Sequence, residues 1–220
     1  IKGGIASSIE VLEDLWRERT FSNTFSGSRT RAFLRAIRIA TAQYLSPGPN
    51  SSGTSVLDPA PLEARLNSVI QAHGGLSPSA RAPSLRAIGV MTTMDGQQRR
   101  PLLFLSSHHH LTPEELTGST FEVCYVEELS ARHGFASAAL PAILPPVELD
   151  TDQGRVRLVD GGISQNIPVD PAVRLGAHRI IVIDISGRSW WLDRYGEAHD
   201  KRPSWEVPAG DDTYCLRPPE

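Results

Sequence analysis

The chain has 220 residues, the size of one globular domain or of one domain with appendages. Hydrophobic residues make up 40% and charged residues 21%, which excludes disordered, collagen-like and coiled-coil chains. The net charge is −3, from 22 Lys and Arg against 25 Asp and Glu, and this balance gives no sign of a nucleic-acid partner. No apolar run approaches the roughly 18 residues of a membrane-spanning helix.

The first half of the chain predicts three helices. Apolar residues recur at steps of three and four over residues 5–19, and again over residues 30–45. A third helix is predicted to begin at Asp58, a typical N-cap residue that Pro59 follows, and to end at Gly74.

The predicted helix over residues 30–45 has a basic face. Arg31, Arg35 and Arg38 recur at steps of four and three, opposite an apolar stripe. That stripe consists of Phe33, Leu34, Ile37 and Tyr44. A basic amphipathic helix can lie on an anionic lipid surface, whereas a helix of an ordinary folded domain can turn the same charges toward solvent. The sequence leaves both interpretations open.

Strands become more frequent after residue 84. Residues 85–92 and 101–106 are strand-like, and Asp95-Gly96 between them predicts a hairpin. The TPEE sequence from Thr112 to Glu115 has the capping-box pattern of a short helix.

A strand–helix–strand unit is predicted over residues 156–185. A short apolar strand over 156–160 ends in glycines, and a helix over 170–175 follows it. The nearly continuous apolar run over 179–185 is typical of a parallel strand that is buried on both faces. This order of elements predicts an α/β domain with a central sheet. Residues 187–220 are predicted to be an irregular C-terminal extension.

The segment over residues 156–170, VRLVDGGISQNIPVD, is the strongest candidate for chemistry. Asp160 ends the predicted strand, and ligands of open α/β sheets bind beyond the carboxyl ends of strands. Gly161 and Gly162 allow a sharp turn and a close approach of substrate, while Asn166 and Pro168 hold the exit of the loop. A carboxylate here is well placed to act as a base, although Asp-Gly is also common in ordinary turns.

Several segments in order resemble the patatin-like phospholipase family. They are ASAALPAILPPV over 136–147, LVDGGISQNIPV over 158–169, LGAHRIIVID over 175–184 and the stretch from Leu57 to Leu66. The resemblance implies an α/β fold in which helices flank a central mixed sheet, truncated at its N-terminus. It places a partial acyl hydrolase domain over residues 1–186, ahead of the extension over 187–220.

The resemblance also implies a function, which is the hydrolysis of acyl esters of phospholipids or related lipids by a Ser–Asp dyad. The aspartate of the family's D-G-G/A motif corresponds to Asp160, the general base. The family's serine lies in a G-x-S-x-G elbow, and a glycine-rich loop supplies the oxyanion hole. A dyad of this kind needs no metal and no organic cofactor. The implied partners are a lipid or acyl-ester substrate and a membrane surface, with no nucleic acid.

The chain departs from the family pattern at the nucleophile. None of its serines has glycine both two positions before and two positions after it. The chain begins with Ile1 instead of Met, so we expect it to start just downstream of the elbow and to lack both the nucleophile and the oxyanion loop. On this hypothesis the 220 residues alone are inactive. The compartment stays open between the cytoplasm and a membrane periphery.

Two other functions fit the same sequence. The chain can be a complete, non-catalytic domain that binds lipid or a protein partner. It can also be an α/β hydrolase that uses one of its own serines with His133 or His178 as base. The three consecutive histidines from His108 to His110 favour a polar loop over a metal site. Cys124 and Cys215 are too far apart in sequence for a disulfide framework or a cysteine zinc site.

Overall fold

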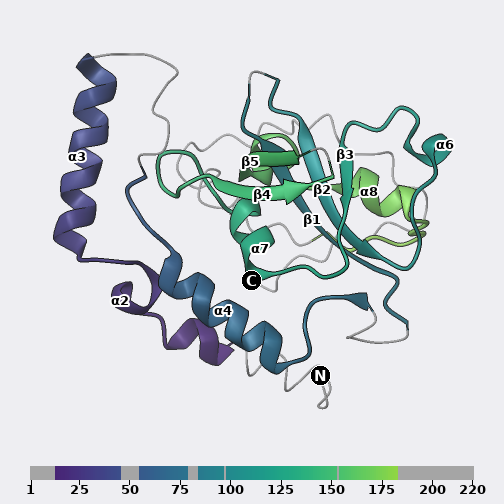
Figure 1. Cartoon of the computed structure of the whole chain (residues 1–220), viewed down its shortest axis with the longest axis horizontal. Helices are drawn as coiled ribbons and strands as arrows, with labels where there is room; N and C mark the ends of the chain where they lie inside the picture. The colour runs from purple at the N-terminus through teal and green to yellow at the C-terminus, as the bar shows by residue number, and fades with distance from the viewer. Residues whose placement is uncertain (1–12, 46–54, 79–83, 97, 153, 183–220) are drawn as a thin grey trace, which may run out of the picture. The chain divides into compact units, whose positions relative to one another are not determined.

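The computed structural model describes residues 13–45, 55–78, 84–96, 98–152 and 154–182 (Figure 1). The chain divides into two compact units, residues 1–168 and residues 169–220. The first unit contains the sheet and most of the described helices, and the described part of the second unit, residues 169–182, contains one short helix.

A five-stranded mixed sheet forms the centre of the first unit (Figure 1). Its order is β3 (Glu122–Tyr125), β2 (Pro101–Ser107), β1 (Ala87–Met94), β5 (Gly154–Asp160) and β4 (Val147–Thr151). The β2–β3 pair is parallel, and the other three pairs are antiparallel. The predicted α/β class with a mixed central sheet is therefore confirmed.

The predicted hairpin over residues 85–106 is confirmed by β1 and β2, which pair from Ala87 with Ser107 to Thr93 with Pro101. The strand β2 is buried along its whole middle, from Leu102 to Ser106. A strand with such a run has no solvent face, so both faces of the sheet are covered at β2. The buried core around it consists of Leu102, Phe104, Cys124, Leu129, Ala136 and Leu158.

The predicted helices appear close to their expected bounds. They are α3 (Arg29–Leu45), α4 (Ala60–Ala72) and α6 (Pro113–Leu116), to which the structure adds α2 (Phe21–Thr24) and α7 (Ala131–Ser137). The expected helix over 5–19 is seen at residues 13–17, and residues 5–12 lie outside the described part. The capping box of α6 forms as predicted, because Thr112 and Glu115 each accept a hydrogen bond from the other's backbone N–H.

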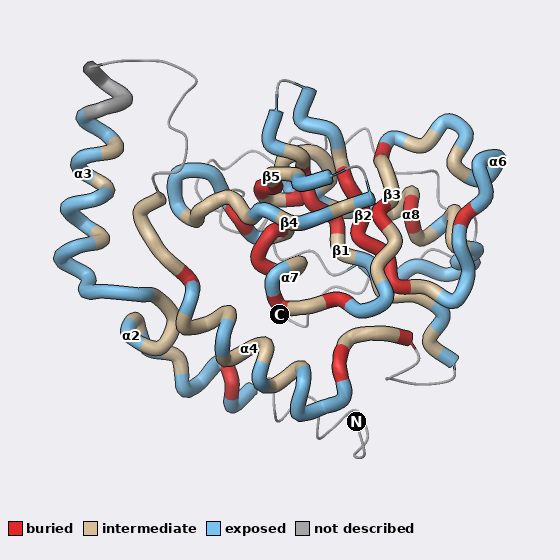
Figure 2. The backbone as a smooth tube through the Cα atoms, in the orientation of Figure 1, coloured by how far each residue is buried: buried red, intermediate tan, exposed pale blue. Residues whose placement is uncertain are grey.

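The helix α7 covers the sheet at β1, β4 and β5, and α4 lies against α7 (Figure 1). Three α7 residues are buried, namely Ala131, Phe135 and Ala136, and Figure 2 shows this buried stretch beside the buried strands. Asn67 on α4 accepts a hydrogen bond of 3.2 Å from the backbone N–H of Ala131, which ties the start of α7 to α4. These contacts fix one wall of the region where β5 ends.

The second unit begins with α8 (Val169–Arg174), where a helix was predicted. Its Asp170 and Arg174 form an ion pair of 2.9 Å one turn apart, and Gly176 ends the helix at a φ of +83°. The predicted strand over 179–185 is wrong in its described part, because residues 179–182 form no strand and Ile181 is 82% exposed. Residues 183–185 and the extension over 187–220 lie outside the described residues.

Candidate active site

Asp160 is the last residue of β5 and lies two residues beyond Leu158, the last β5 residue that pairs with β4. It pairs with Thr92 of β1, and its backbone N–H donates a hydrogen bond of 3.0 Å to the carbonyl of Ala139, just after α7. The main chain of Asp160 is therefore held by a neighbouring strand and by the segment that follows α7. The residue itself is half-buried.

The side chain of Asp160 organises the turn that follows it. Its Oδ1 atom accepts a hydrogen bond of 2.7 Å from the N–H of Gly162, at the start of the 3₁₀ turn η1 (Gly161–Ile163). This contact is an aspartate cap of the kind expected from an Asp-Gly turn. Within the described residues, the other carboxylate oxygen has no hydrogen-bond partner. One oxygen thus fixes the rotamer, and the other is left for a further proton donor.

The glycines after Asp160 are required by close approach. A Cβ on Gly161 would lie 2.3 Å from the backbone oxygen of Met91 on β1. A Cβ on Gly162 would lie 2.9 Å from Asp160 Oδ1 and 3.0 Å from Asn166 Oδ1. The η1 turn therefore lies against the β1 backbone with no room for a side chain at Gly161.

The buried hydroxyl of Thr93 holds the loop that follows Asp160, and nothing in the sequence indicated this role. Thr93 on β1 is 0% exposed, and its Oγ1 donates a hydrogen bond of 2.8 Å to the backbone oxygen of Asp160. The Ser164 hydroxyl lies 2.7 Å from the same Oγ1. Because the Thr93 proton goes to Asp160, Ser164 must be the donor in the second bond. Threonine is common in strands, so its presence at position 93 does not point to a special role. The role follows only from the pairing of β1 with β5.

All five residues predicted for the site line one open cavity of about 410 Å³ in the first unit. They are Asp160, Gly161, Gly162, Asn166 and Pro168. The other walls come from β1 at residues 89–91, from α7 and from the loop, and these residues are Gly89, Val90, Met91, Gly134, Ser137 and Gln165. The cavity is of a size that small-molecule sites commonly have. Its lining combines a carboxylate, polar side chains and the apolar side chains of Val90, Met91 and Pro168.

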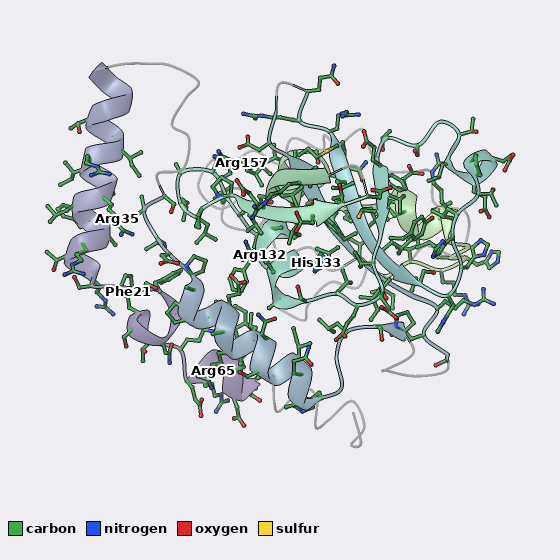
Figure 3. All side chains as sticks on the ribbon, in the orientation of Figure 1. Phe21, Arg35, Arg65, Arg132, His133 and Arg157 are labelled. Carbon is green, nitrogen blue, oxygen red and sulfur yellow. The ribbon has the colours of Figure 1, made fainter. Side chains whose placement is uncertain are left out.

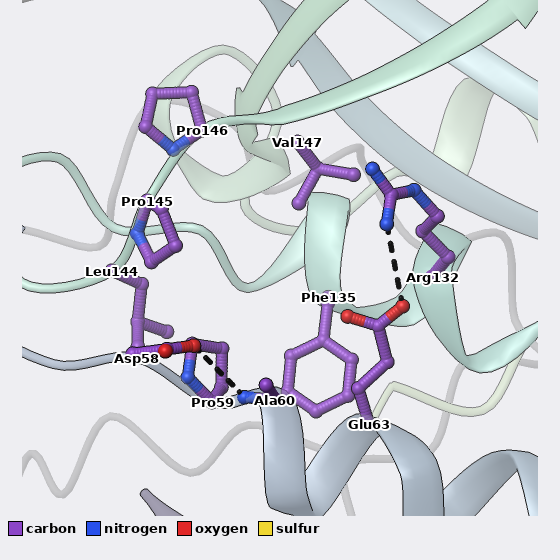
Figure 4. Close-up of a pocket in the computed structure, with 10 residues that line it drawn as sticks. All are labelled: Asp58, Pro59, Ala60, Glu63, Arg132, Phe135, Leu144, Pro145, Pro146 and Val147. Carbon is purple, nitrogen blue, oxygen red and sulfur yellow. Dashed lines mark hydrogen bonds and ion pairs between the residues drawn. The ribbon is translucent and has the colours of Figure 1, made fainter. Parts of the chain in front are cut away.

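A smaller cavity of about 120 Å³ holds none of the five predicted residues (Figure 4). It lies where α4 begins, and its walls include Asp58 and Pro59 on one side and Pro145 and Pro146 on the other. A 3.5 Å ion pair between Glu63 and Arg132 closes one side. It therefore brings together two of the sequence segments that carried the family resemblance. Its two carboxylates are those of Asp58, which accepts a hydrogen bond of 3.1 Å from the Ala60 N–H, and Glu63.

His133, the alternative base, is engaged elsewhere (Figure 3). Its Nδ1 accepts a hydrogen bond of 3.0 Å from the Ser130 N–H, and its ring stacks edge-on against Phe104 at 4.8 Å. A triad histidine donates from Nδ1 to a carboxylate, whereas this Nδ1 carries no proton to donate. Burial lowers the pKa of the His133 imidazole below 6.5. His133 thus fits a capping role better than that of a catalytic base.

The other histidines are at the surface. His108, His109 and His110 are exposed, and His178 in the second unit is exposed as well. The Nε2 atom of His109 lies 3.5 Å from a carboxylate oxygen of Glu115. The pKa of the Glu115 carboxyl lies below its usual value, mainly because the carboxylate accepts a hydrogen bond from the Thr112 backbone N–H. No group of three or more His, Cys, Asp or Glu side chains arranged for a metal ion is found in the part of the chain that is described.

Comparison with known protein families places most of the chain in one of them. The family model described as patatin-like phospholipase matches residues 4–173. No curated protein and no solved structure shows significant similarity to the chain. Among the described helices, none has the length and apolar character needed to cross a membrane.

Proposed function

The chain belongs to the patatin-like phospholipase family, and we propose that it serves the hydrolysis of phospholipid or related acyl esters with Asp160 as the general base. The observation that carries the proposal is the position of Asp160. Its carboxylate lies at the end of a sheet strand and lines the larger cavity, and one of its oxygens is fixed by the Gly162 N–H. A base needs this combination of a fixed rotamer and an oxygen free to accept a proton.

In the proposed reaction Asp160 transfers one proton in each of two steps. It takes the proton of a serine hydroxyl as the serine oxygen attacks the acyl carbonyl carbon, and it gives that proton to the departing alcohol. The products are an acyl-serine ester and free alcohol. Water then attacks this ester and passes its proton through Asp160 to the serine oxygen, which releases the fatty acid. The negative oxygen of each tetrahedral intermediate requires hydrogen-bond donors from an oxyanion hole.

The serine in this proposal is not among the 220 residues. No serine in the chain has glycine on both sides at two residues' distance, and no described serine is hydrogen-bonded to the Asp160 carboxylate. Ser164, the serine nearest in sequence, uses its hydroxyl on Thr93. We therefore expect the nucleophile and the oxyanion loop on a segment upstream, and we expect the 220 residues alone to be inactive.

The test compares two polypeptides in the hydrolysis of a p-nitrophenyl acyl ester and in labelling by a fluorophosphonate. One is the 220-residue chain, and the other adds the residues encoded in frame upstream of Ile1. We expect only the longer polypeptide to be labelled and active. Its Asp160→Asn variant should lose on the order of 10³- to 10⁴-fold in kcat, as expected for loss of a catalytic base or its partner.

Three results count against the proposal. If Asp160→Asn keeps the full rate, Asp160 is not the base. If a serine of the 220-residue chain is labelled, the nucleophile lies within this chain. The α/β hydrolase alternative, in which one of these serines acts with a histidine base, then replaces the Ser–Asp dyad. A longer polypeptide that carries no such serine and shows no activity favours the non-catalytic alternative, in which the domain binds lipid or a protein partner.

A further inference from the structure

The helix α3 carries an exposed apolar stripe that no described residue covers. Phe33 is 65% exposed, Leu34 59% and Ile37 45%. Most of the stability of a helix in a protein comes from packing such a stripe against another surface. The stripe of α3 therefore calls for a surface to cover it.

All the charged residues of α3 are positive. Arg29, Arg31, Arg35 and Arg38 all lie within the helix, and its 17 residues include no Asp or Glu. Figure 3 marks Arg35 among the side chains that project from this helix. Within the described residues, none of the four arginines forms an ion pair. The whole chain has a net charge of −3, so α3 is a local concentration of positive charge on an acidic protein.

The stability of α3 does not explain the two arginines in its first turn. Positive charges near the N-terminus of a helix oppose the helix dipole, and Arg29 and Arg31 lie in the first turn. Ser28 caps this end, because it accepts a hydrogen bond of 3.3 Å from the Arg31 N–H. Arg29 and Arg31 thus cost the helix some stability, and a negatively charged partner would compensate for that cost.

We propose that α3 docks the protein on an anionic lipid surface. The apolar stripe enters the boundary between headgroups and acyl chains, and the arginines bind the lipid phosphates. The helix is about 25 Å long at 1.5 Å per residue, so it lies along the surface and does not cross it. A nucleic acid would use the arginines but leave Phe33, Leu34 and Ile37 in water, which favours lipid.

The relevance of a membrane rests on the proposed function, because the substrate of a phospholipid hydrolase is itself a component of the membrane. The docking test does not depend on catalysis. In the longer polypeptide of the activity test, we expect variants of α3 to keep the rate on a soluble monomeric ester. Failure of docking and failure of hydrolysis are therefore measured separately.

The experiment is co-sedimentation of the 220-residue chain with vesicles. Vesicles of phosphatidylcholine alone are compared with vesicles of two parts phosphatidylcholine to one part phosphatidylserine. We expect the triple variant Arg31→Gln, Arg35→Gln, Arg38→Gln to bind the anionic vesicles roughly 100-fold more weakly than the unaltered chain. The double variant Phe33→Ser, Ile37→Ser should lose about tenfold or more.

A matched control carries the same charge change elsewhere. Arg86, Arg99 and Arg179 are exposed, and none forms an ion pair within the described residues. Their triple Gln variant should bind the anionic vesicles nearly as well as the unaltered chain. Circular dichroism of each variant checks that the fold is intact.

Three results would overturn the proposal. The first is that the unaltered chain does not sediment with anionic vesicles. The second is that the α3 arginine variant binds these vesicles as well as the control variant does. The third result comes from sedimentation without vesicles. If the chain self-associates there, and the Phe33→Ser, Ile37→Ser variant is monomeric with unchanged vesicle binding, a second copy of the chain covers the stripe.

Discussion

The buried hydroxyl of Thr93 donates a hydrogen bond of 2.8 Å to the backbone carbonyl of Asp160, on the neighbouring strand. The same hydroxyl accepts from Ser164, the fourth residue after β5. The end of β5 and the loop after it therefore depend on one side chain of β1. Neither bond involves the Asp160 carboxylate, so Thr93 acts on the position of that carboxylate and leaves its chemistry alone.

Thr93→Val should destabilise the fold by about 1–3 kcal/mol. Valine has the shape of threonine but leaves the Asp160 carbonyl and the Ser164 hydroxyl without this partner at a buried site. Urea unfolding measures the change, and Thr93→Ser, which keeps the hydroxyl, should lose less. Equal stability of the valine variant and the unaltered chain would show that water replaces both bonds.

Gly161→Ala and Gly134→Ala should change stability in opposite directions. An alanine Cβ at position 161 meets the Met91 backbone oxygen at 2.3 Å, and we expect a loss of about 1–3 kcal/mol or more. At position 134, inside α7, nothing lies within 4 Å of the new Cβ. Alanine there should add about 0.5–1 kcal/mol, because it favours a helix more than glycine does. Thermal unfolding of both variants is the measurement, and an unchanged or raised melting temperature of Gly161→Ala would contradict the close contact at Gly161.

Asp160→Asn should leave the fold nearly unchanged. The asparagine side chain keeps an oxygen that can accept the hydrogen bond from the Gly162 N–H. We expect a stability change within about 1 kcal/mol, the usual worth of one such bond. Urea midpoints of the two proteins provide the comparison. A large loss would mean that the carboxylate charge itself holds the turn, and an activity lost in this variant would then no longer report on the base alone.

Stability should fall on acidification in part through His133. Burial lowers the pKa of the folded imidazole, while the unfolded group keeps a value near 6.5. As pH falls below 6.5, the unfolded chain binds the proton first, so this contribution is complete above 6.5 and is lost toward the lower folded pKa. Urea midpoints at pH 7.5 and 5.5 test it. The His133→Asn variant keeps an acceptor for the Ser130 N–H and should lose less over this window, whereas equal losses would assign the effect to other groups.

Local signals in the sequence predicted the elements whose partners are close in the chain. The hairpin of β1 and β2 follows from two apolar runs around Asp95-Gly96, and α6 follows from its capping box. The position of Asp160 at the end of a strand was predictable for the same reason. The run of apolar residues after β5 is the counterexample, because an apolar segment becomes a strand only if a sheet edge accepts it.

The pairing of distant segments was not predictable. Both sides of β5 are occupied, by β1 and by β4, and both pairs are antiparallel. Residues 179–182 form no strand, although their composition is typical of a buried strand. The role of Thr93 was hidden for a related reason, since it appears only once the register places Thr93 opposite Val159.

The join between β1 and β5 also bears on how the protein folds. The hairpins β1–β2 and β4–β5 each close over a short connection, whereas the Thr93–Asp160 contact joins residues 67 apart in the sequence. Short loops close quickly, and contacts between distant residues pay a larger loop-closure entropy before they form. The two hairpins are therefore expected to form first and to meet later along this join. The candidate site lies beside the β1–β5 pairing, so the cavity is expected to form in the late steps of folding. A delay in folding would therefore be seen in the contacts around the cavity and not within either hairpin.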